Sequence, residues 1–294
     1  MIHTGILEYR GARYLWISIA LIAICTGIYL SQTGGEQPAN GGTWQGYTTG
    51  TLGALLILWL SMIGIRKRRY KSRVGSVAGW TSAHVYLGAS VIIVATLHSA
   101  GQLGWNIHTL AYVLMCAVVI SGFFGIYYYL SIPGKSLQNR GGQSREVLFE
   151  ELHELDSEGR AAARLCGGEI AAGASSAIER TSIGGGLVAQ LFRSDGSQMS
   201  IVEAGKPKIV ENKDQGRILA MIAGRIPDAK RQSEVEPLSN LMSIMGRRQA
   251  VIRRIVRDIQ LQGLLKVWLY LHIPLTVALL VSLIAHIVST FLYW

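Results

Sequence analysis

Five long apolar stretches run through this sequence, and they limit the folds that the chain can adopt. They cover residues 14–30, 48–65, 79–100, 105–132 and 264–294. A helix needs roughly 17 to 25 predominantly apolar residues to cross the hydrocarbon core of a bilayer. Half of all residues are hydrophobic and only 16% are charged, which is unusual for a soluble domain. We therefore predict an all-α transmembrane bundle of five helices, with lipid as a direct partner.

The basic residues predict the orientation of these helices. The linker 31–47 contains no Lys or Arg, whereas six basic residues follow the second stretch within 66–73. The positive-inside rule places that basic turn in the cytoplasm. The N-terminus is then inside, Trp294 is outside, and every Lys and Arg lies on the inner side. We expect a bacterial cytoplasmic membrane, and the first stretch lacks a small-residue cleavage site, so we expect it to remain as an anchor.

The formal net charge of +10 does not indicate nucleic-acid binding. Most of the excess lies next to the apolar stretches, where basic residues have a topological explanation. The three cysteines, Cys25, Cys116 and Cys166, are far apart and form no CxxC or CxxCH motif. We therefore expect neither an iron–sulfur cluster nor covalently attached haem in this chain.

The segment 133–263 is too long for a connector, so we predict a folded cytoplasmic insert, mixed α/β or mainly α. The domains are then 1–132, with the first four transmembrane helices, 133–263, and 264–294, with the fifth. Within the insert, the residue patterns predict a helix over 146–166, one or two strands over 198–210, and a basic helix over 237–263 that runs into the fifth stretch. No GxGxxG turn or P-loop indicates a nucleotide site.

Four of the seven histidines form two equal intervals within the apolar stretches. His84 and His98 lie on the third stretch, and His272 and His286 lie on the fifth. Fourteen residues fall about 40° short of four helical turns, so each pair shares one helix face at a separation of about 21 Å. Both stretches run from inside to outside, so His84 matches His272 in depth and His98 matches His286. The pattern predicts two stacked sites.

An imidazole inside lipid is costly unless its nitrogens have partners. One interpretation is that each histidine is a hydrogen-bonded packing residue. The equal intervals at matching depths favour ligation instead, because a bound iron satisfies one nitrogen of each ring. We therefore predict two haem b groups, each with bis-histidine axial ligation, and all four histidines as metal ligands.

The two motifs are HVYLGASVIIVATLH over 84–98 and HIPLTVALLVSLIAH over 272–286. In these motifs the membrane half resembles the transmembrane domains of ferric reductases and NADPH oxidases, in which helices three and five carry paired haem ligands. Respiratory quinol-oxidising cytochromes b use the same interval on helices two and four. The resemblance implies a di-haem b-type cytochrome. A sixth helix and a flavin–nicotinamide domain normally follow in the reductases, whereas this sequence stops at Trp294, so we expect electron exchange with quinone or partner subunits.

Five further residues are candidates for contact with the cofactor. Gly88 leaves room for a porphyrin edge, as Ala95 and Ser282 do, although tight helix packing explains small residues equally well. Lys266 is placed to pair with a haem propionate, and it also fits the positive-inside pattern. His108, at the outer end of the fourth stretch, could donate to a propionate or contact a quinone head group. The alternative for His108 is an interfacial histidine with no such role.

Iron with both axial positions filled suits single-electron transfer. We predict an electron-transfer subunit of an oxidoreductase complex, as in a respiratory chain. It would carry electrons across the membrane between a cytoplasmic-side or quinone donor or acceptor and an outer-side cytochrome or iron–sulfur protein. The insert would dock a cytoplasmic redox or regulatory protein. Two alternatives stay open: a haem-free transporter or sensor with proton-relay histidines, and a scaffold subunit that binds haem without turnover.

Overall fold

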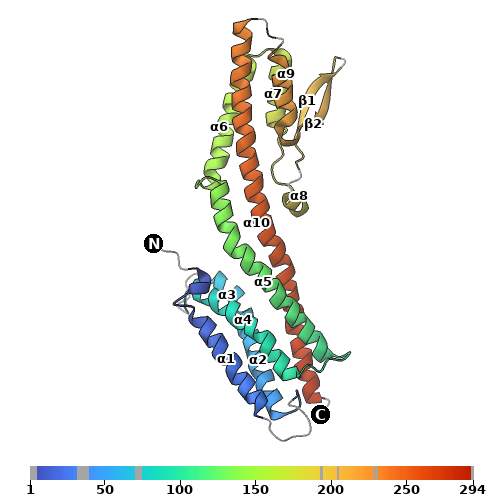
Figure 1. The fold of residues 1–294 in the computed structure, drawn as a ribbon. Coiled ribbons are helices and arrows are strands. Elements are labelled where there is room, and N and C mark those ends of the chain that lie inside the picture. The colour runs from blue at the N-terminus through green and yellow to red at the C-terminus, as the bar shows by residue number, and fades with distance from the viewer. Residues whose placement is uncertain are drawn as a thin grey trace. The chain divides into compact units, whose positions relative to one another are not determined.

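The computed structural model describes residues 5–31, 40–69, 75–192, 195–203, 205–227, 229 and 231–292. The chain divides into two compact units. Unit 1 comprises Met1–Tyr127 with Trp268–Trp294, and unit 2 comprises Tyr128–Val267. Two helices, α5 (Ile107–Asn139) and α10 (Gln232–Leu292), contribute to both units (Figure 1).

Five helices among the described residues are long and apolar enough to cross a membrane, as the sequence predicted. They are α1 (Arg13–Leu30), α2 (Trp44–Ser61) continued by α3 (Ile63–Arg68), α4 (Val77–Ser99), α5 and α10. A short 3-10 helix, η1 (Ile6–Glu8), precedes α1.

The helices differ from the predicted apolar stretches at some of their ends. The predicted helix over 48–65 starts earlier, at Trp44, and is interrupted at Met62. The fourth helix does not stop at residue 132, because α5 continues through Pro133 to Asn139. The early start of α2 has a local cause: the Thr43 hydroxyl accepts a hydrogen bond from the Gly46 N–H at 3.2 Å. Such an N-cap satisfies one of the unpaired donors of the first turn.

The helices of unit 1 pack through small and polar residues on their inner faces. An added Cβ at Gly53 of α2 would lie 3.7 Å from Val94 of α4, and Ser18 of α1 donates to the carbonyl oxygen of Tyr86 on α4 at 3.0 Å. Large apolar side chains point outward instead, among them Trp16, Leu55, Phe124 and Val281. This distribution is the one expected of helices surrounded by lipid, where small residues allow close helix contacts.

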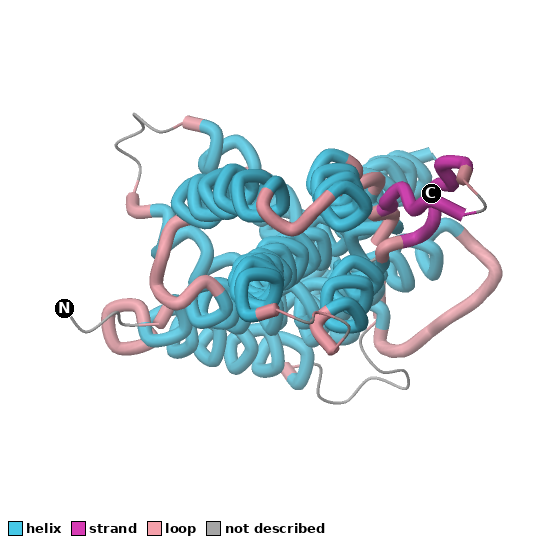
Figure 2. Tube along the Cα trace, turned by 90° about the horizontal axis from the view of Figure 1, so that it is seen from above, coloured by secondary structure: helices cyan, strands magenta, loops and turns pink. Residues whose placement is uncertain are grey.

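Unit 2 is mainly helical, with one two-stranded sheet among its described residues. Between the ends of α5 and α10 lie α6 (Arg145–Arg164), α7 (Gly168–Glu179), α8 (Leu187–Phe192), β1 (Gln198–Glu203), β2 (Lys206–Glu211), η2 (Lys213–Gln215) and α9 (Gly216–Arg225). The two strands pair antiparallel, with Gln198 opposite Glu211 and Glu203 opposite Lys206, and Figure 2 draws this hairpin in magenta.

The predictions for the insert are confirmed where they were specific. A helix covers nearly all of 146–166, two strands cover 198–210, and the basic helix continues into the fifth apolar stretch as α10. The sequence interpretation missed α7, α8 and α9.

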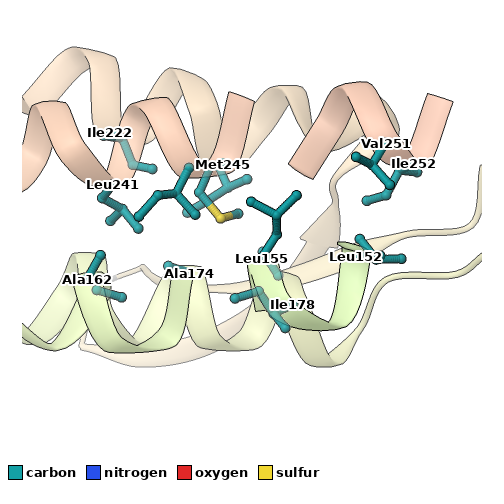
Figure 3. Packing of buried hydrophobic residues seen from close by; sticks show 14 of the residues in the cluster. Leu152, Leu155, Ala162, Ala174, Ile178, Ile222, Leu241, Met245, Val251 and Ile252 are labelled. Carbon is teal, nitrogen blue, oxygen red and sulfur yellow. The ribbon is translucent and has the colours of Figure 1, made fainter. Parts of the chain in front are cut away.

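The core of unit 2 forms where α6 and α7 pack against α9 and the first half of α10. Buried residues recur every three or four positions along α6, which marks one helix face. They include Leu148, Leu152, Leu155, Gly159 and Ala162. They meet side chains of α10 such as Leu241 and Met245 (Figure 3). Gly159 keeps this contact close, because an added Cβ would lie 3.3 Å from the side chain of Ile178 of α7.

Two buried charges link α10 to neighbouring segments of unit 2. Arg248, 1% exposed, donates to Asp156 of α6 at 2.6 Å and to the side chains of Gln215 and Thr181, each at 2.9 Å. Asp258, also 1% exposed, accepts from both Arg145 and Ser136. Buried charges of this kind are tolerated only when they are paired and hydrogen-bonded.

Candidate metal centre

The register of α4 and α10 brings the two histidine intervals together within unit 1. Val91 is the midpoint between His84 and His98, and Leu279 is the midpoint between His272 and His286. Both midpoint side chains are buried in one hydrophobic cluster, together with Leu60 and Met115. Since the middles of both intervals belong to this one cluster, the histidines on either side of it lie at corresponding levels.

The outer pair, His98 and His286, meets directly. Their ring centroids are 5.9 Å apart and the ring planes are perpendicular. Two imidazoles that share one metal ion, each with a metal–nitrogen bond of about 2.0 Å, have centroids roughly 6 Å apart. The separation of this pair therefore fits a shared metal.

The inner pair, His84 and His272, comes from the same two helices, with His84 on α4 and His272 on α10. The indole of Trp268 lies beside His272, with ring centroids 5.2 Å apart. Its Nε1 donates to the carbonyl oxygen of Ser121 at 2.8 Å. An added Cβ at Gly122 would lie 3.9 Å from Cε1 of His272. At this level Trp268 and His272 of α10 thus lie against the middle of α5.

Both histidines of α4 are oriented by backbone carbonyl groups of α2. The Nδ1 of His98 donates to the carbonyl oxygen of Gly46 at 2.8 Å, and the Nδ1 of His84 donates to that of Leu60 at 3.1 Å. A carbonyl oxygen only accepts, so each Nδ1 carries the proton. Each Nε2 then presents a lone pair, which is the form of histidine that binds a metal.

On α10, Ser121 of α5 orients His272 in a similar way. The single hydroxyl proton of Ser121 is donated to the carbonyl oxygen of Val118 at 2.7 Å. The Ser121 oxygen is then an acceptor for the Nδ1 of His272, also at 2.7 Å. With the hydroxyl proton donated to Val118, Nδ1 carries the proton here too, and Nε2 presents the lone pair.

His286 is hydrogen-bonded to His108, the first-turn histidine of α5. The two Nδ1 atoms are 2.5 Å apart and the ring centroids are 4.5 Å apart. One of the two nitrogens must donate and the other accept. If His286 donates, it has the same tautomer as the other three histidines. From the sequence, His108 was a candidate for contact with a haem propionate or a quinone head group. In the structure it contacts His286, one of the four predicted metal ligands.

The sequence interpretation missed the glycines that shape these contacts. An added Cβ at Gly50 of α2 would lie 2.7 Å from the ring of His98, and one at Gly125 of α5 would overlap the indole of Trp268. Gly46, Gly50 and Gly53 follow one another at intervals of four and three residues on one face of α2. Such a spacing of small residues is typical of close helix contacts in membranes. It was the signal in the sequence from which this close contact of α2 could have been predicted.

The remaining predicted site residues differ in their surroundings. An added Cβ at Gly88 would meet no atom within 4 Å, so there is open space beside this residue. Ala95 packs against the hydrophobic cluster that contains Val91 and Leu279. Ser282 is buried and donates to the carbonyl oxygen of Leu279 on its own helix. Both are therefore packing residues. Lys266 is exposed and belongs to unit 2.

Among the described residues, no three His, Cys, Asp or Glu side chains group together as a metal site. A bis-histidine haem would need only two protein ligands at each iron, fewer than the three side chains that such a group requires. Comparison of the chain with protein-family models, curated proteins and solved structures gave no match.

Proposed function

We propose that this chain is a membrane-embedded di-haem cytochrome b that conducts single electrons across the bilayer. His84 and His272 would hold the inner haem, and His98 and His286 the outer one. The observation that carries the proposal is the outer pair, two imidazoles from α4 and α10 with ring centroids 5.9 Å apart.

The hydrogen bonds to Nδ1 support this assignment. Metal-bound histidines usually donate their other ring N–H to a carbonyl, carboxylate or similar acceptor, which holds the ring and its tautomer. Three of the four proposed ligands have such an acceptor, at Leu60, Gly46 and Ser121. The fourth, His286, has His108 as its partner. None of the hydrogen bonds among the described residues uses Nε2 of these four histidines.

The protein's own part in electron transfer would be to hold and orient the two haems and to keep the space between them apolar. When bound, haem supplies one-electron redox chemistry. The layer of Val91 and Leu279 separates the two levels and keeps the space between them apolar. The levels are fourteen helical residues apart, about 21 Å, which covers most of the roughly 30 Å hydrocarbon core.

The orientation and the partners belong to the same proposal. The basic residues after α2 put the insert on the cytoplasmic side, where it would dock a redox or regulatory protein. The haems would exchange electrons with quinone, or with a cytochrome or iron–sulfur protein on the outer side of the membrane. The chain would act as a subunit of an oxidoreductase complex.

A second candidate function rests on the hydrogen bond between His108 and His286. Linked imidazoles can pass protons, so a haem-free transporter or sensor with a histidine relay is the alternative. It differs from the first proposal in needing no cofactor and in moving protons without electrons.

Vesicles separate the two functions. The purified chain is reconstituted with ferricyanide trapped inside, and dithionite is added outside. The electron-transfer proposal predicts loss of ferricyanide absorbance that depends on the chain and stops in His98→Ala and His272→Ala. A relay predicts no ferricyanide reduction, but a change in the signal of a trapped pH-sensitive dye when a pH gradient is applied. Ferricyanide that survives while both haems become reduced would contradict electron transfer across the bilayer.

A further inference from the structure

Helix α8 exposes two large apolar side chains on one face. Val188 is 69% exposed and Phe192 is 78% exposed, and their spacing of four residues puts them on the same side of the helix. The residues between them, Ala189, Gln190 and Leu191, are partly buried. A single exposed apolar residue needs no explanation, but an ordered apolar face on so short a helix calls for a partner.

The position of α8 on α10 indicates which partner. The side chain of Gln260 donates to the carbonyl oxygen of Leu191 at 2.8 Å. An added Cβ at Gly263 would lie 3.7 Å from Gln190 and 3.8 Å from Leu191. The fifth apolar stretch begins at the next residue, Leu264. Figure 1 shows α8 beside this part of α10. Helix α8 is therefore attached within one turn of the start of a membrane-crossing stretch.

Charge at this level points to the same partner. Arg254 and Arg257 are exposed on the three turns of α10 that precede Gly263. Arg257 also donates to the side chain of Gln260 at 2.7 Å, the residue that holds α8. Basic side chains next to a membrane helix are attracted to anionic lipid head groups, and apolar side chains of short amphipathic segments enter the boundary between head groups and acyl chains.

We infer that α8 is an interfacial anchor, with Val188 and Phe192 inserted into the surface of the bilayer from which α10 emerges. The inference rests on the proposed membrane insertion of α10, and it gives the insert a second attachment to the membrane besides the two continuous helices. The occupant of the apolar face is lipid, not a protein partner.

Photo-crosslinking to phospholipid tests this contact. The full chain, with p-benzoylphenylalanine in place of Val188 or Phe192, is reconstituted in vesicles of phosphatidylcholine and phosphatidylglycerol, irradiated and analysed by mass spectrometry. Two matched positions serve as controls. Val281, 64% exposed on the apolar part of α10, reports on membrane insertion itself. Leu165, 72% exposed just after α6, reports on the surface of the insert.

Leu165 is a suitable control because α6 leads away from α8. Its first residue, Arg145, pairs with Asp258, and Gly159 lies against Ile244 and Met245, nearly twenty residues before Gly263. We expect phospholipid adducts at 188, 192 and 281 in several-fold excess over those at 165. Two results would overturn the α8 anchor alone, provided that position 281 still gives lipid adducts. Positions 188 and 192 could both give no more lipid adducts than position 165, or they could crosslink to protein instead of lipid. Absence of adducts at 281 as well would overturn the membrane insertion of α10.

Discussion

The Nδ1 of His98 donates a hydrogen bond to the carbonyl oxygen of Gly46 at 2.8 Å, across the contact between α4 and α2. One turn further along α2, Gly50 lies so close to the same imidazole that a Cβ would be 2.7 Å from it. The backbone of α2 thus sets both the tautomer and the position of this ring. His84, at the other end of the interval, has the same relation to Leu60.

Replacement of Gly50 is therefore expected to damage the outer site selectively. Gly50→Ala puts a methyl group where real Cβ contacts are not found, so the ring of His98 or helix α2 must shift, which disturbs the alignment of His98 with His286. We expect the haem content to fall from two per chain toward one, with the inner haem kept. The measure is haem per chain by pyridine haemochrome assay, with Gly27→Ala as control, because an added Cβ there meets nothing within 4 Å. Equal haem loss in both variants would contradict the assignment.

Alanine variants of the four ligands should fall into two pairs. His98→Ala and His286→Ala remove the two sides of one site, so each is expected to lose the same haem, and the double variant to lose no more. His84→Ala combined with His98→Ala should lose both, because the sites are separate. Redox titration of the remaining haem identifies which site is empty in each variant. A single variant that empties both sites, or a within-pair double variant that loses more than its singles, would refute the pairing.

Ser121→Ala is expected to weaken the inner site without abolishing it. The variant removes the acceptor of the His272 Nδ1 proton, and loss of such a partner typically costs on the order of 10-fold or more in metal affinity. A ligand whose N–H is hydrogen-bonded is the stronger electron donor, so the reduction potential of the inner haem should rise. The control is Ser282→Ala, since Ser282 is buried but bonds only within its own helix. An unchanged inner potential would rule out this role of Ser121.

The insert offers a matched pair of Asp–Arg bridges for a stability test. Asp258 is 1% exposed and accepts from Arg145, whereas Asp214 and its partner Arg253 are each about half exposed. Asp258→Asn should lower the opening free energy of α6 by about 3 kcal/mol, because it leaves cationic groups at a buried site. Asp214→Asn should cost below about 1 kcal/mol, because an exposed pair contributes little. Hydrogen exchange of α6 amides measures the first loss and that of amides in α9, the helix directly after Asp214, measures the second. Equal losses would disprove the distinction.

Much of the membrane half could be predicted because its signals are local. The length and hydropathy of the apolar stretches, and the fourteen-residue intervals of His84–His98 and His272–His286, need no knowledge of neighbours. The contacts that orient these rings were not predictable in the same way. The partners of these rings belong to helices that are far from the histidines in the sequence. They are Gly46, Leu60, Ser121 and His108. Only the fold decides which of their carbonyl or hydroxyl groups meets an imidazole.

The missed elements of the insert have a similar explanation. The segment that forms α7, GEIAAGASSAIE, contains two glycines and is poor in large apolar residues, so its pattern resembles a connector. In the folded unit, Ala174 and Ala177 are fully buried, and Met221 of α9 lies against Gly173. Small residues here allow close packing, which is a tertiary cause. The sequence did not predict where α5 ends, because a proline usually marks a helix end, whereas Pro133 is accommodated inside the helix.

The most direct test of the account is the amount and type of haem in the purified, detergent-solubilised chain. A pyridine haemochrome assay, normalised to protein by amino-acid analysis, is expected to give two non-covalent haem b groups per chain, with both irons low-spin in their spectra. A preparation from haem-sufficient cells that shows no Soret absorbance, and does not acquire any when free haem is added, would contradict the central claim that His84, His98, His272 and His286 bind two haems.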